Sequence, residues 1–227
     1  MLIPSIDLMG GKIVQLVQGE KKALEFENFD EWVERFSHFR LVQLIDLDAA
    51  FGTGGNQSLI CGFVQRLPCQ VGGGIRSVAA AQQILSAGAR RVILGSTLIR
   101  QGAINTRFAE EIAAAVGRDR LVFALDSKGG QVAIRGWREL TSITPLQMIR
   151  KLQPWCAAFL YTHIDTEGLM QGIPLEIVRE LREATANQLI VAGGISTDAE
   201  VDQLHAIGVD AVVGMALYLN RITLRPV

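Results

Sequence analysis

The sequence predicts an α/β protein, a (β/α)8 TIM barrel built from two duplicated half-barrels. Short apolar runs rich in Val, Ile and Leu alternate with longer amphipathic stretches along the 227 residues. This alternation is typical of parallel strands that are buried on both faces and connected by helices. Several motifs also recur about 119 residues apart, which indicates an internal repeat. Eight strands in a chain of this length favour a closed barrel.

The expected elements follow one another with short connections. Strands are expected at residues 2–7, 41–46, 69–72, 91–95, 121–126, 157–163, 188–192 and 210–214, and helices at 29–38, 77–87, 105–116, 145–153, 174–185 and 198–207. Thr144-Pro145 and Thr197-Asp198 are helix start signals, and Gly88 and Gly208 end two equivalent helices. No linker-like segment interrupts the pattern. A single domain, 1–227, with half-barrel repeats of about 1–118 and 119–227, is therefore predicted.

Composition limits the classes of function. Hydrophobic residues make up 49% of the chain, charged residues 20%, and the net charge is −1, which describes a globule without an overall field that attracts nucleic acid. The chain shows no signal peptide and no apolar run long enough for a membrane span, so no membrane association is expected. The odd number of cysteines, Cys61, Cys69 and Cys156, lacks metal-like spacing. Reduced thiols in a cytoplasmic protein are the expected interpretation.

Two aspartates are the candidate catalytic groups. Asp7 in IPSIDLMGG recurs as Asp126 in VFALDSKGG, and each directly follows an apolar strand. Catalytic residues of such barrels lie at the carboxyl ends of the strands, so the two carboxyls are expected to face each other across the barrel mouth. One could accept a proton while the other donates one. A single aspartate there could instead cap a segment or pair with Lys12 or Lys128, but two equivalent positions favour catalysis.

Paired glycine turns predict two phosphate sites. The turn at 72–74 recurs at 192–194, and the segment 95–97 recurs at 214–216. Bare backbone and the free N–H groups of a helix start can bind a phosphate, although one glycine turn alone is often only a tight bend. The paired turns favour a ligand with a phosphate at each end, held by Gly73, Gly74, Gly95, Ser96, Gly193, Gly194, Gly214 and Met215.

These motifs together resemble the ProFAR isomerase family of histidine biosynthesis. The resemblance covers nearly the whole chain and includes IPSIDLMGGKIVQLVQG, LIDLDAAFGTGGN, QVGGGIRS, VILGST, FALDSKGGQVAIRGW, the THIDTEG segment and VAGGIST. It implies a half-barrel duplication that isomerises an aminoaldose to an aminoketose by an Amadori rearrangement. The substrate would be a small bisphosphorylated ribonucleotide, and no cofactor and no metal would be needed.

By resemblance, particular positions acquire roles. Asp7 matches the general base and Asp126 the general acid, and Thr162 matches a threonine near the acid. Trp137 matches an aromatic residue of a mobile loop that stacks on the substrate, although it could simply cover an apolar patch. The remaining matches are substrate-binding or loop positions: Gly19, which would turn the chain into a lid formed by a mobile segment 20–28, Arg76, which could also be a surface residue, and Glu167 and Gly168.

Two positions depart from the family pattern. Gln15 stands where arginine is frequent, which removes a charge, and Glu167 stands where aspartate is usual, which lengthens the reach of the carboxyl by one methylene. Glu167 with His163 and Asp165 could also form a metal site. Alternating strand residues point to opposite faces, and no second histidine is near, so we disfavour this interpretation.

The C-terminal segment is short for a complete eighth outer helix. We expect apolar surface beside the first strand, covered by an oligomer contact or by a poorly ordered tail, in a monomer or weak homo-oligomer. Other functions remain open at this point. They are the sister cyclase subunit of imidazole glycerol phosphate synthase, which binds a glutaminase, an isomerase that also accepts phosphoribosylanthranilate, and a non-catalytic sugar-phosphate binder.

Overall fold

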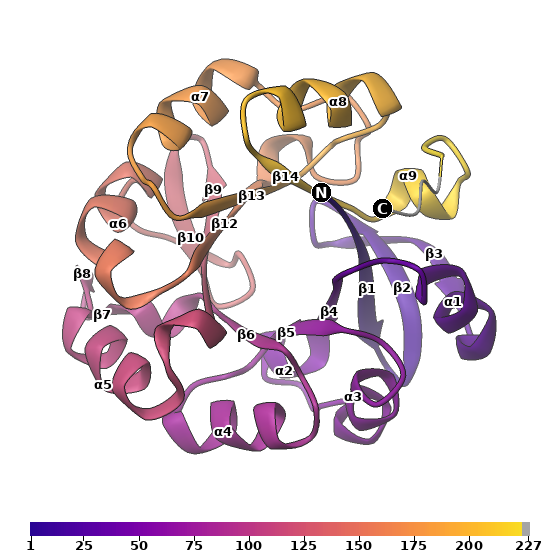
Figure 1. Ribbon diagram of the computed structural model, residues 1–227, viewed down its shortest axis with the longest axis horizontal. Helices are drawn as coiled ribbons and strands as arrows, with labels where there is room; N and C mark the ends of the chain where they lie inside the picture. The colour runs from indigo at the N-terminus through magenta and orange to yellow at the C-terminus, as the bar shows by residue number, and fades with distance from the viewer. Residues whose placement is uncertain (224–227) are drawn as a thin grey trace.

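The computed structural model of the chain describes residues 1–223 and contains a closed barrel of parallel strands (Figure 1). Each expected strand is present within two residues of its predicted start. The barrel closes because the sixth strand pairs with the ninth and the last with the first. In order around the barrel, the strands are β1 (Leu2–Met9), β4 (Val42–Asp46), β5 (Cys69–Gly72), β6 (Arg91–Leu94), β9 (Leu121–Lys128), β12 (Ala158–His163), β13 (Gln188–Ala192) and β14 (Asp210–Val213).

Helices surround the barrel and bury one apolar stripe each against it (Figure 1). The longer ones are α1 (Phe29–Phe36), α3 (Gln57–Val64), α4 (Val78–Ser86), α5 (Thr106–Val116), α6 (Pro145–Leu152), α7 (Leu175–Glu183) and α8 (Asp198–Ala206). The sequence analysis did not identify α3, although Ile60, Phe63 and Val64 give it a helical apolar stripe. Short helical turns lie between strands and helices: α2 (Leu47–Phe51), η1 (Ser96–Leu98), η2 (Arg118–Arg120), η3 (Gln153–Trp155), η4 (Ile164–Thr166) and α9 (Met215–Tyr218).

The predicted helix starts are confirmed by their capping contacts. The Thr144 side chain accepts from the backbone N–H of Gln147, and the Thr197 side chain accepts from that of Glu200. In both helices the side chain of the third residue also accepts a hydrogen bond from the backbone N–H of the cap, which completes a capping box. The sequence signals therefore located these helix ends because the contacts are local.

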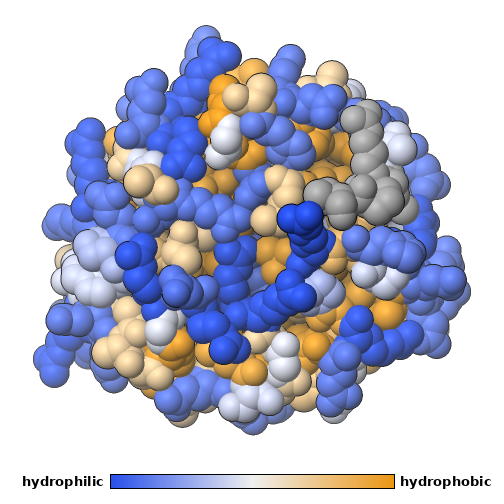
Figure 2. Space-filling model, in the orientation of Figure 1, coloured by the Kyte–Doolittle hydropathy of each residue, from blue (hydrophilic) through white to orange (hydrophobic). Residues whose placement is uncertain are grey.

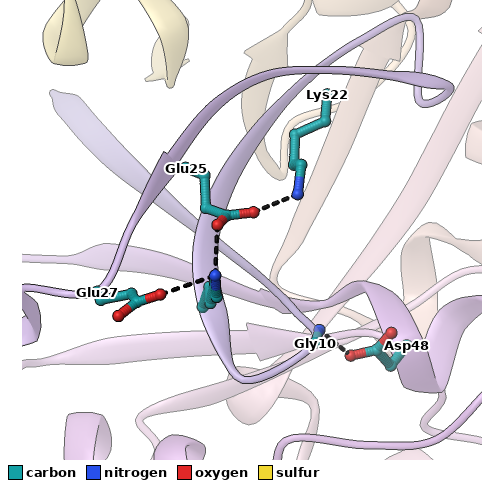
Figure 3. Close-up of polar contacts among 6 residues, drawn as sticks. Gly10, Lys22, Glu25, Glu27 and Asp48 are labelled. Atoms are coloured by element: carbon teal, nitrogen blue, oxygen red, sulfur yellow. Dashed lines mark hydrogen bonds and ion pairs between the residues drawn. The ribbon is translucent and has the colours of Figure 1, made fainter.

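The segment expected to be a mobile lid is instead a strand. β2 (Lys12–Val17) turns back on β1, and β3 (Lys21–Phe26) pairs with β2 in an antiparallel hairpin. Glu25 forms an ion pair with Lys22, which Figure 3 shows. A second ion pair joins Glu25 Oε1 to Lys12 Nζ at 2.5 Å. The polar side chains that predicted mobility are therefore ion-paired on the outer face of a hairpin. Smaller strands are β7 (Ile99–Arg100), β8 (Ala103–Ile104), β10 (Gln131–Ile134) and β11 (Glu139–Leu140).

The expectation of exposed apolar surface beside the first strand is wrong for the described residues. The eighth outer helix is indeed short, because α9 covers only four residues and residues 224–227 lie outside the described part. However, the Tyr218 ring of α9 lies 4.2 Å from the Trp32 ring and 5.3 Å from the Phe26 ring, and these side chains are packed in the core. Aromatic residues of the hairpin and α1 therefore fill the volume that a longer helix would occupy.

The outer surface is correspondingly polar. Figure 2 shows hydrophilic residues over most of the outline of one face, with hydrophobic residues mainly between them. Leu140 and Leu219 are the exposed large hydrophobic residues in the described part of the chain. Within residues 1–223, no helix combines the length and apolar character needed to cross a membrane.

Candidate active site

The mouth of the barrel contains a cavity of about 210 Å³ at the carboxyl ends of the strands. Every predicted site residue lines it, although the predicted residues come from positions throughout the chain. The structure thus brings together Asp7, Gly19, Gly73, Gly74, Arg76, Gly95, Ser96, Asp126, Trp137, Thr162, Glu167, Gly168, Gly193, Gly194, Gly214 and Met215.

Asp7 lies near the end of β1 with its carboxyl in the cavity. Ser5, two residues earlier on the same face of the strand, donates a hydrogen bond to Asp7 Oδ1 at 3.0 Å. Gln15 of β2 donates to Asp7 Oδ2 at 3.4 Å because the hairpin folds back alongside β1. Burial raises the pKa of Asp7 to about 6, and the Ser5 hydrogen bond offsets part of that rise.

Asp126 occupies the equivalent place on β9, and its backbone is in register with Thr162 of the neighbouring β12. Burial raises the pKa of the Asp126 carboxyl, while hydrogen bonds from the Trp137 and Thr162 side chains lower it. Thr162, which was expected near the acid, therefore contacts it, and so does Trp137, which was expected only to stack on the substrate.

Glu167 adds a third carboxyl to the same mouth. Its pKa is raised to about 8 by burial and by the negative charges of Asp7 and Asp126. Three carboxyls in one cavity cannot all ionise at neutral pH without strong repulsion. Glu167 is therefore protonated near pH 7, while Asp7 is mostly ionised.

The glycine turns approach neighbouring backbone too closely for a side chain. A Cβ at Gly73 would lie 2.1 Å from the carbonyl oxygen of Asp46, and a Cβ at Gly193 would lie 2.4 Å from that of His163. Both glycines have positive φ, 95° and 110°. The two turns therefore require glycine for the same physical reason.

The other pair of turns also shares one conformation. Gly95 precedes η1 with φ −124° and ψ −92°, and Gly214 precedes α9 with φ −105° and ψ −97°. Each exposes the start of a short helical turn to the cavity. Backbone N–H groups at such a position can bind an anion.

Three loops meet over the cavity. The backbone N–H of Gln18 donates to the carbonyl of Glu167 at 3.1 Å, which links the β2–β3 turn to the segment after β12. The Trp137 ring packs against Gly19, where a Cβ would lie 2.6 Å from it. The backbone N–H of Arg135 donates to Ser96 Oγ at 2.8 Å. Loops from both halves of the barrel thus cover the same mouth.

The loop that carries Trp137 is strained. Arg135, Gly136 and Trp137 have consecutive positive φ values of 56°, 66° and 66°. Left-handed backbone at non-glycine residues costs of order 1–3 kcal/mol each and is common at functional sites. This conformation aims the indole into the cavity.

Some lining residues have no role in the sequence analysis. Ser5, Gln43 and Phe51 line the cavity as well. Ser5 could have been found because it lies two residues before Asp7 on one face of a strand. Gln15 was noticed only as a missing charge, since its contact with Asp7 depends on a hairpin that the sequence did not predict.

Arg76 and His163 have structural partners. The Arg76 guanidinium donates to the carbonyls of Ala49 and Ala50 at 3.1 and 3.2 Å while also lining the cavity. His163 Nδ1 is 2.7 Å from Thr166 Oγ1. Within residues 1–223, no three His, Cys, Asp or Glu side chains are arranged to hold a metal.

The fold and the cavity define a (β/α)8 barrel of the enzyme type, with its functional groups at the carboxyl ends of the strands. Titratable groups with shifted pKa values gather there. The model of a family described as "Histidine biosynthesis protein" matches residues 1–223, and the chain belongs to that family.

Curated relatives align over the full length. A protein of Methanocaldococcus jannaschii is 37% identical over 232 residues, which cover 99% of this chain and 96% of the relative. One of Thermus thermophilus is 38% identical over 231 residues, with 99% and 97% covered. Both carry the name 1-(5-phosphoribosyl)-5-((5-phosphoribosylamino)methylideneamino) imidazole-4-carboxamide isomerase, that is, ProFAR isomerase. A Methanococcus voltae relative of the same name is 36% identical.

Proposed function

We propose that this protein is an aldose–ketose isomerase that converts ProFAR to its ribulosyl isomer by an Amadori rearrangement. The observation that carries the proposal is the pair Asp7 and Asp126, which occupy equivalent strand ends in one cavity between two sets of glycine turns. Relatives that bear the isomerase name over the whole length support the same assignment.

The proposed reaction needs one proton donor and one proton acceptor. Asp126 protonates the ribose ring oxygen, the bond from that oxygen to C1′ breaks, and the open sugar becomes a Schiff base. Asp7 then removes the C2′ proton to give an enolamine, which becomes the ketose. Overall, C2′ and its hydroxyl each lose a proton, while C1′ and the ring oxygen each gain one, so the substrate is isomerised without a redox cofactor. Proton transfers by positioned side chains contribute about 10²–10⁴ in rate.

The pKa of Asp7 supports its proposed role as the base. A pKa of about 6 leaves Asp7 ionised at neutral pH and therefore able to act as a base. Glu167, with a pKa of about 8, keeps a proton and can donate a hydrogen bond at the mouth. We propose that Glu167 assists Asp126 at the ring oxygen or holds the substrate by this hydrogen bond.

The two sets of turns would hold the two ends of the substrate. Gly73 and Gly95 belong to one side of the cavity, and Gly193 and Gly214 to the other. A phosphate at each set would orient the reacting ribose between the carboxyls, and binding energy from such remote groups can accelerate the reaction. Trp137 would close over this ligand.

We also propose that the protein acts in the cytoplasm as a monomer or weak homo-oligomer on a small-molecule substrate. Cys61, Cys69 and Cys156 are free thiols, which fits a reducing compartment. Two scattered exposed residues, Leu140 and Leu219, form no extended apolar patch in the described part of the chain.

The decisive experiment is turnover of purified protein with ProFAR, followed by absorbance, beside Asp7→Asn and Asp126→Asn. We expect the wild type to convert ProFAR and both variants to lose about 10²–10⁴ in kcat/KM. Leu219→Gln, an exposed change outside the cavity, is the control for general damage. ProFAR binding without turnover by the wild type would contradict the isomerase and favour a binding protein.

A parallel assay with phosphoribosylanthranilate tests the range of substrates. Gln15 contacts Asp7 and leaves no cation at that place, but the cavity has two sets of glycine turns, which match the two phosphates of ProFAR. Conversion of both substrates would make the enzyme bifunctional. Conversion of ProFAR alone is the expected result.

A further inference from the structure

The interior of the barrel carries a row of buried polar side chains. Ser5, Gln43 and Gln70 point inward from β1, β4 and β5 and are 5%, 6% and 0% exposed. The rest of the interior is an apolar cluster that includes Val122, Ala158 and Ile190. Barrel interiors are normally filled by bulky apolar side chains. A buried polar row therefore requires an explanation.

These side chains form one continuous hydrogen-bonded chain that ends at Asp7. Arg91 Nη2 donates to Gln70 Oε1 at 2.9 Å, and Gln70 Nε2 donates to Gln43 Oε1 at 3.0 Å. Gln43 Nε2 then donates to Ser5 Oγ at 3.4 Å, and Ser5 Oγ donates to Asp7 Oδ1 at 3.0 Å. The chain crosses the barrel interior from the amino ends of the strands to the carboxyl ends.

The direction of the chain is fixed by its two ends. A guanidinium can only donate, so Gln70 must turn its oxygen toward Arg91 and its amide nitrogen toward Gln43. Gln43 must likewise accept through its oxygen and donate through its amide nitrogen, so the Ser5 hydroxyl accepts from Gln43 and donates to Asp7. An ionised carboxylate can only accept. Every dipole is therefore aligned to present a donor to Asp7 in its ionised form.

The far end of the chain is anchored. Arg91 Nη1 donates to Gln188 Oε1 at 2.6 Å, and Gln188 Nε2 donates to Asp210 Oδ2 at 2.5 Å. Asp210 lies near enough to favour the charged form of Arg91, which burial disfavours. This second branch holds the guanidinium in place without contacting Asp7.

We propose that Ser5, Gln43, Gln70 and Arg91 are positioning residues that orient the Asp7 carboxylate and keep it ionised, so that the base is set from inside the barrel. The proposal rests on the proposed function only in calling Asp7 the base.

Other groups that face Asp7 act in the opposite direction. The carboxyl of Glu167 and the phenol of Tyr218 interact electrostatically with Asp7 from two other elements, and the Asp126 carboxyl lines the same cavity. Negative charge on these groups disfavours negative charge on Asp7. Gln15 adds one longer hydrogen bond at 3.4 Å. The chain through Ser5 is thus the main interaction that favours the carboxylate.

The test is a direct titration of Asp7 by NMR with ¹³C-labelled aspartate carboxyls, in which Asp7→Asn assigns the signal. We expect Ser5→Ala to raise the Asp7 pKa by about one unit, because a hydrogen bond to a charged group is lost. Gln43→Met and Gln70→Met should raise it by progressively less, about half a unit at the far position, since aligned hydrogen bonds strengthen one another only partly. Ser5→Thr, which keeps the hydroxyl, should restore the wild-type value.

Gln188→Met is the matched control because it makes the same chemical change in the same interior but on the anchoring branch. A purely structural chain would lower the stability of Gln70→Met and Gln188→Met alike and leave the Asp7 titration unmoved, which would overturn the proposal. Ser5→Ala is the smallest change and decides the matter if a glutamine variant does not fold. Since the titration needs no substrate, absence of ProFAR turnover would contradict the proposed function without affecting this result.

Discussion

The two halves of the barrel place Asp7 and Asp126 at equivalent strand ends but surround them differently. Beneath Asp7 lies Ser5, whose hydroxyl donates to it, whereas the equivalent residue beneath Asp126 is Ala124, which offers no hydrogen bond. Asp126 instead receives hydrogen bonds from Thr162 and from Trp137 of the loop above it. One carboxyl is held from inside the barrel and the other from its neighbouring strand and a loop. Neighbouring groups can thus give two equivalent acids different roles.

The glycine turns are where the halves resemble each other most, and the largest effects are expected there. Gly73→Ala and Gly193→Ala should each destabilise the fold by about 3–5 kcal/mol, because a Cβ would meet backbone at 2.1 and 2.4 Å in a left-handed conformation. Urea unfolding measures the loss. Gly10→Ala is the control, since its φ is 59° but nothing lies within 4 Å, and it should cost only about 1–2 kcal/mol. Unequal losses at Gly73 and Gly193 would break the equivalence of the turns.

The aspartates after β4 and β12 distinguish the halves. Asp46 is buried and accepts from the Asn56 backbone at 2.7 Å and from the Asn56 side chain at 2.8 Å. The equivalent Asp165 is 41% exposed and accepts from Gly129 at 2.9 Å. We expect Asp46→Ala to cost about 3 kcal/mol and Asp165→Ala less than about 1 kcal/mol, because only the first leaves buried donors unpaired. Thermal unfolding of both variants tests the difference, and similar Tm values would contradict it.

Glu167 provides a difference that depends on pH. Its folded-state pKa of about 8 lies above the ordinary 4.5, so the folded protein loses stability as the pH rises from about 4.5 to 8. Glu167→Gln should therefore be more stable than the wild type by about 2 kcal/mol at pH 6 and by more at pH 9, with the advantage vanishing near pH 4.5. Chemical unfolding across this range measures it.

Glu25 should show the opposite pH dependence of stability, because its pKa is lowered whereas that of Glu167 is raised. Its hydrogen bonds and ion pairs with Lys12 and Lys22 lower its pKa to about 2. Glu25 therefore stabilises the fold above about pH 4.5 and loses this contribution as the pH falls toward 2. If the stability gained by Glu167→Gln did not grow with pH, burial and neighbouring charges would not be raising the pKa of the Glu167 carboxyl.

The same titrations predict the pH profile of turnover. Activity should rise as Asp7 ionises near pH 6 and decline above about pH 8 as Glu167 loses its proton. Glu167→Gln should flatten the alkaline side of the kcat/KM profile and leave the acid side in place. An unchanged alkaline limb in this variant would assign that limb to another group of the coupled cluster.

The smallest expected effect concerns equivalent helix caps. Ser77 caps α4 through a single hydrogen bond to the Ala80 N–H, whereas Thr197 caps α8 in a complete box with Glu200. Thr197→Ala should cost about 1 kcal/mol and Ser77→Ala about half as much. Helix-specific hydrogen exchange and urea unfolding resolve such a difference. A larger loss at Ser77 would mean that tertiary packing, not the box, limits the stability of these helix ends.

Local signals made much of this fold predictable. Apolar runs located the barrel strands, and the Thr144 and Thr197 caps located helix starts, because strand burial and capping both act within a few residues. The repeated motifs also identified residues that line the cavity, since equivalent strand ends meet at one mouth. The strand Lys21–Phe26 was missed because it is stabilised by pairing with β2 and by the ion pair of Glu25 with Lys12, neither of which a local pattern contains.

Interactions between distant segments were not predictable. Gln43 and Gln70 look like ordinary polar interruptions of apolar runs until the closed barrel places them in one hydrogen-bonded chain. Similarly, Tyr218 meets Trp32 only because the end of the chain returns to the first helix. Gln43 and Gln70 are 27 positions apart, and Trp32 and Tyr218 are separated by most of the chain, so no pattern within a short window contains these contacts.

The closure of the barrel has a consequence for the growing polypeptide. Leu2 of β1 pairs with Ala211 of β14, and the Tyr218 hydroxyl reaches the carbonyl of Ser5 at 3.0 Å. During synthesis, the strand that carries Asp7 therefore has an unpaired edge until the last strand leaves the ribosome. Such an edge can pair with other chains. A chain that ended after β13 would contain Asp7, Asp126 and Glu167 but would leave this edge of β1 unpaired, so the last strand must be made before the barrel around these carboxyls can close.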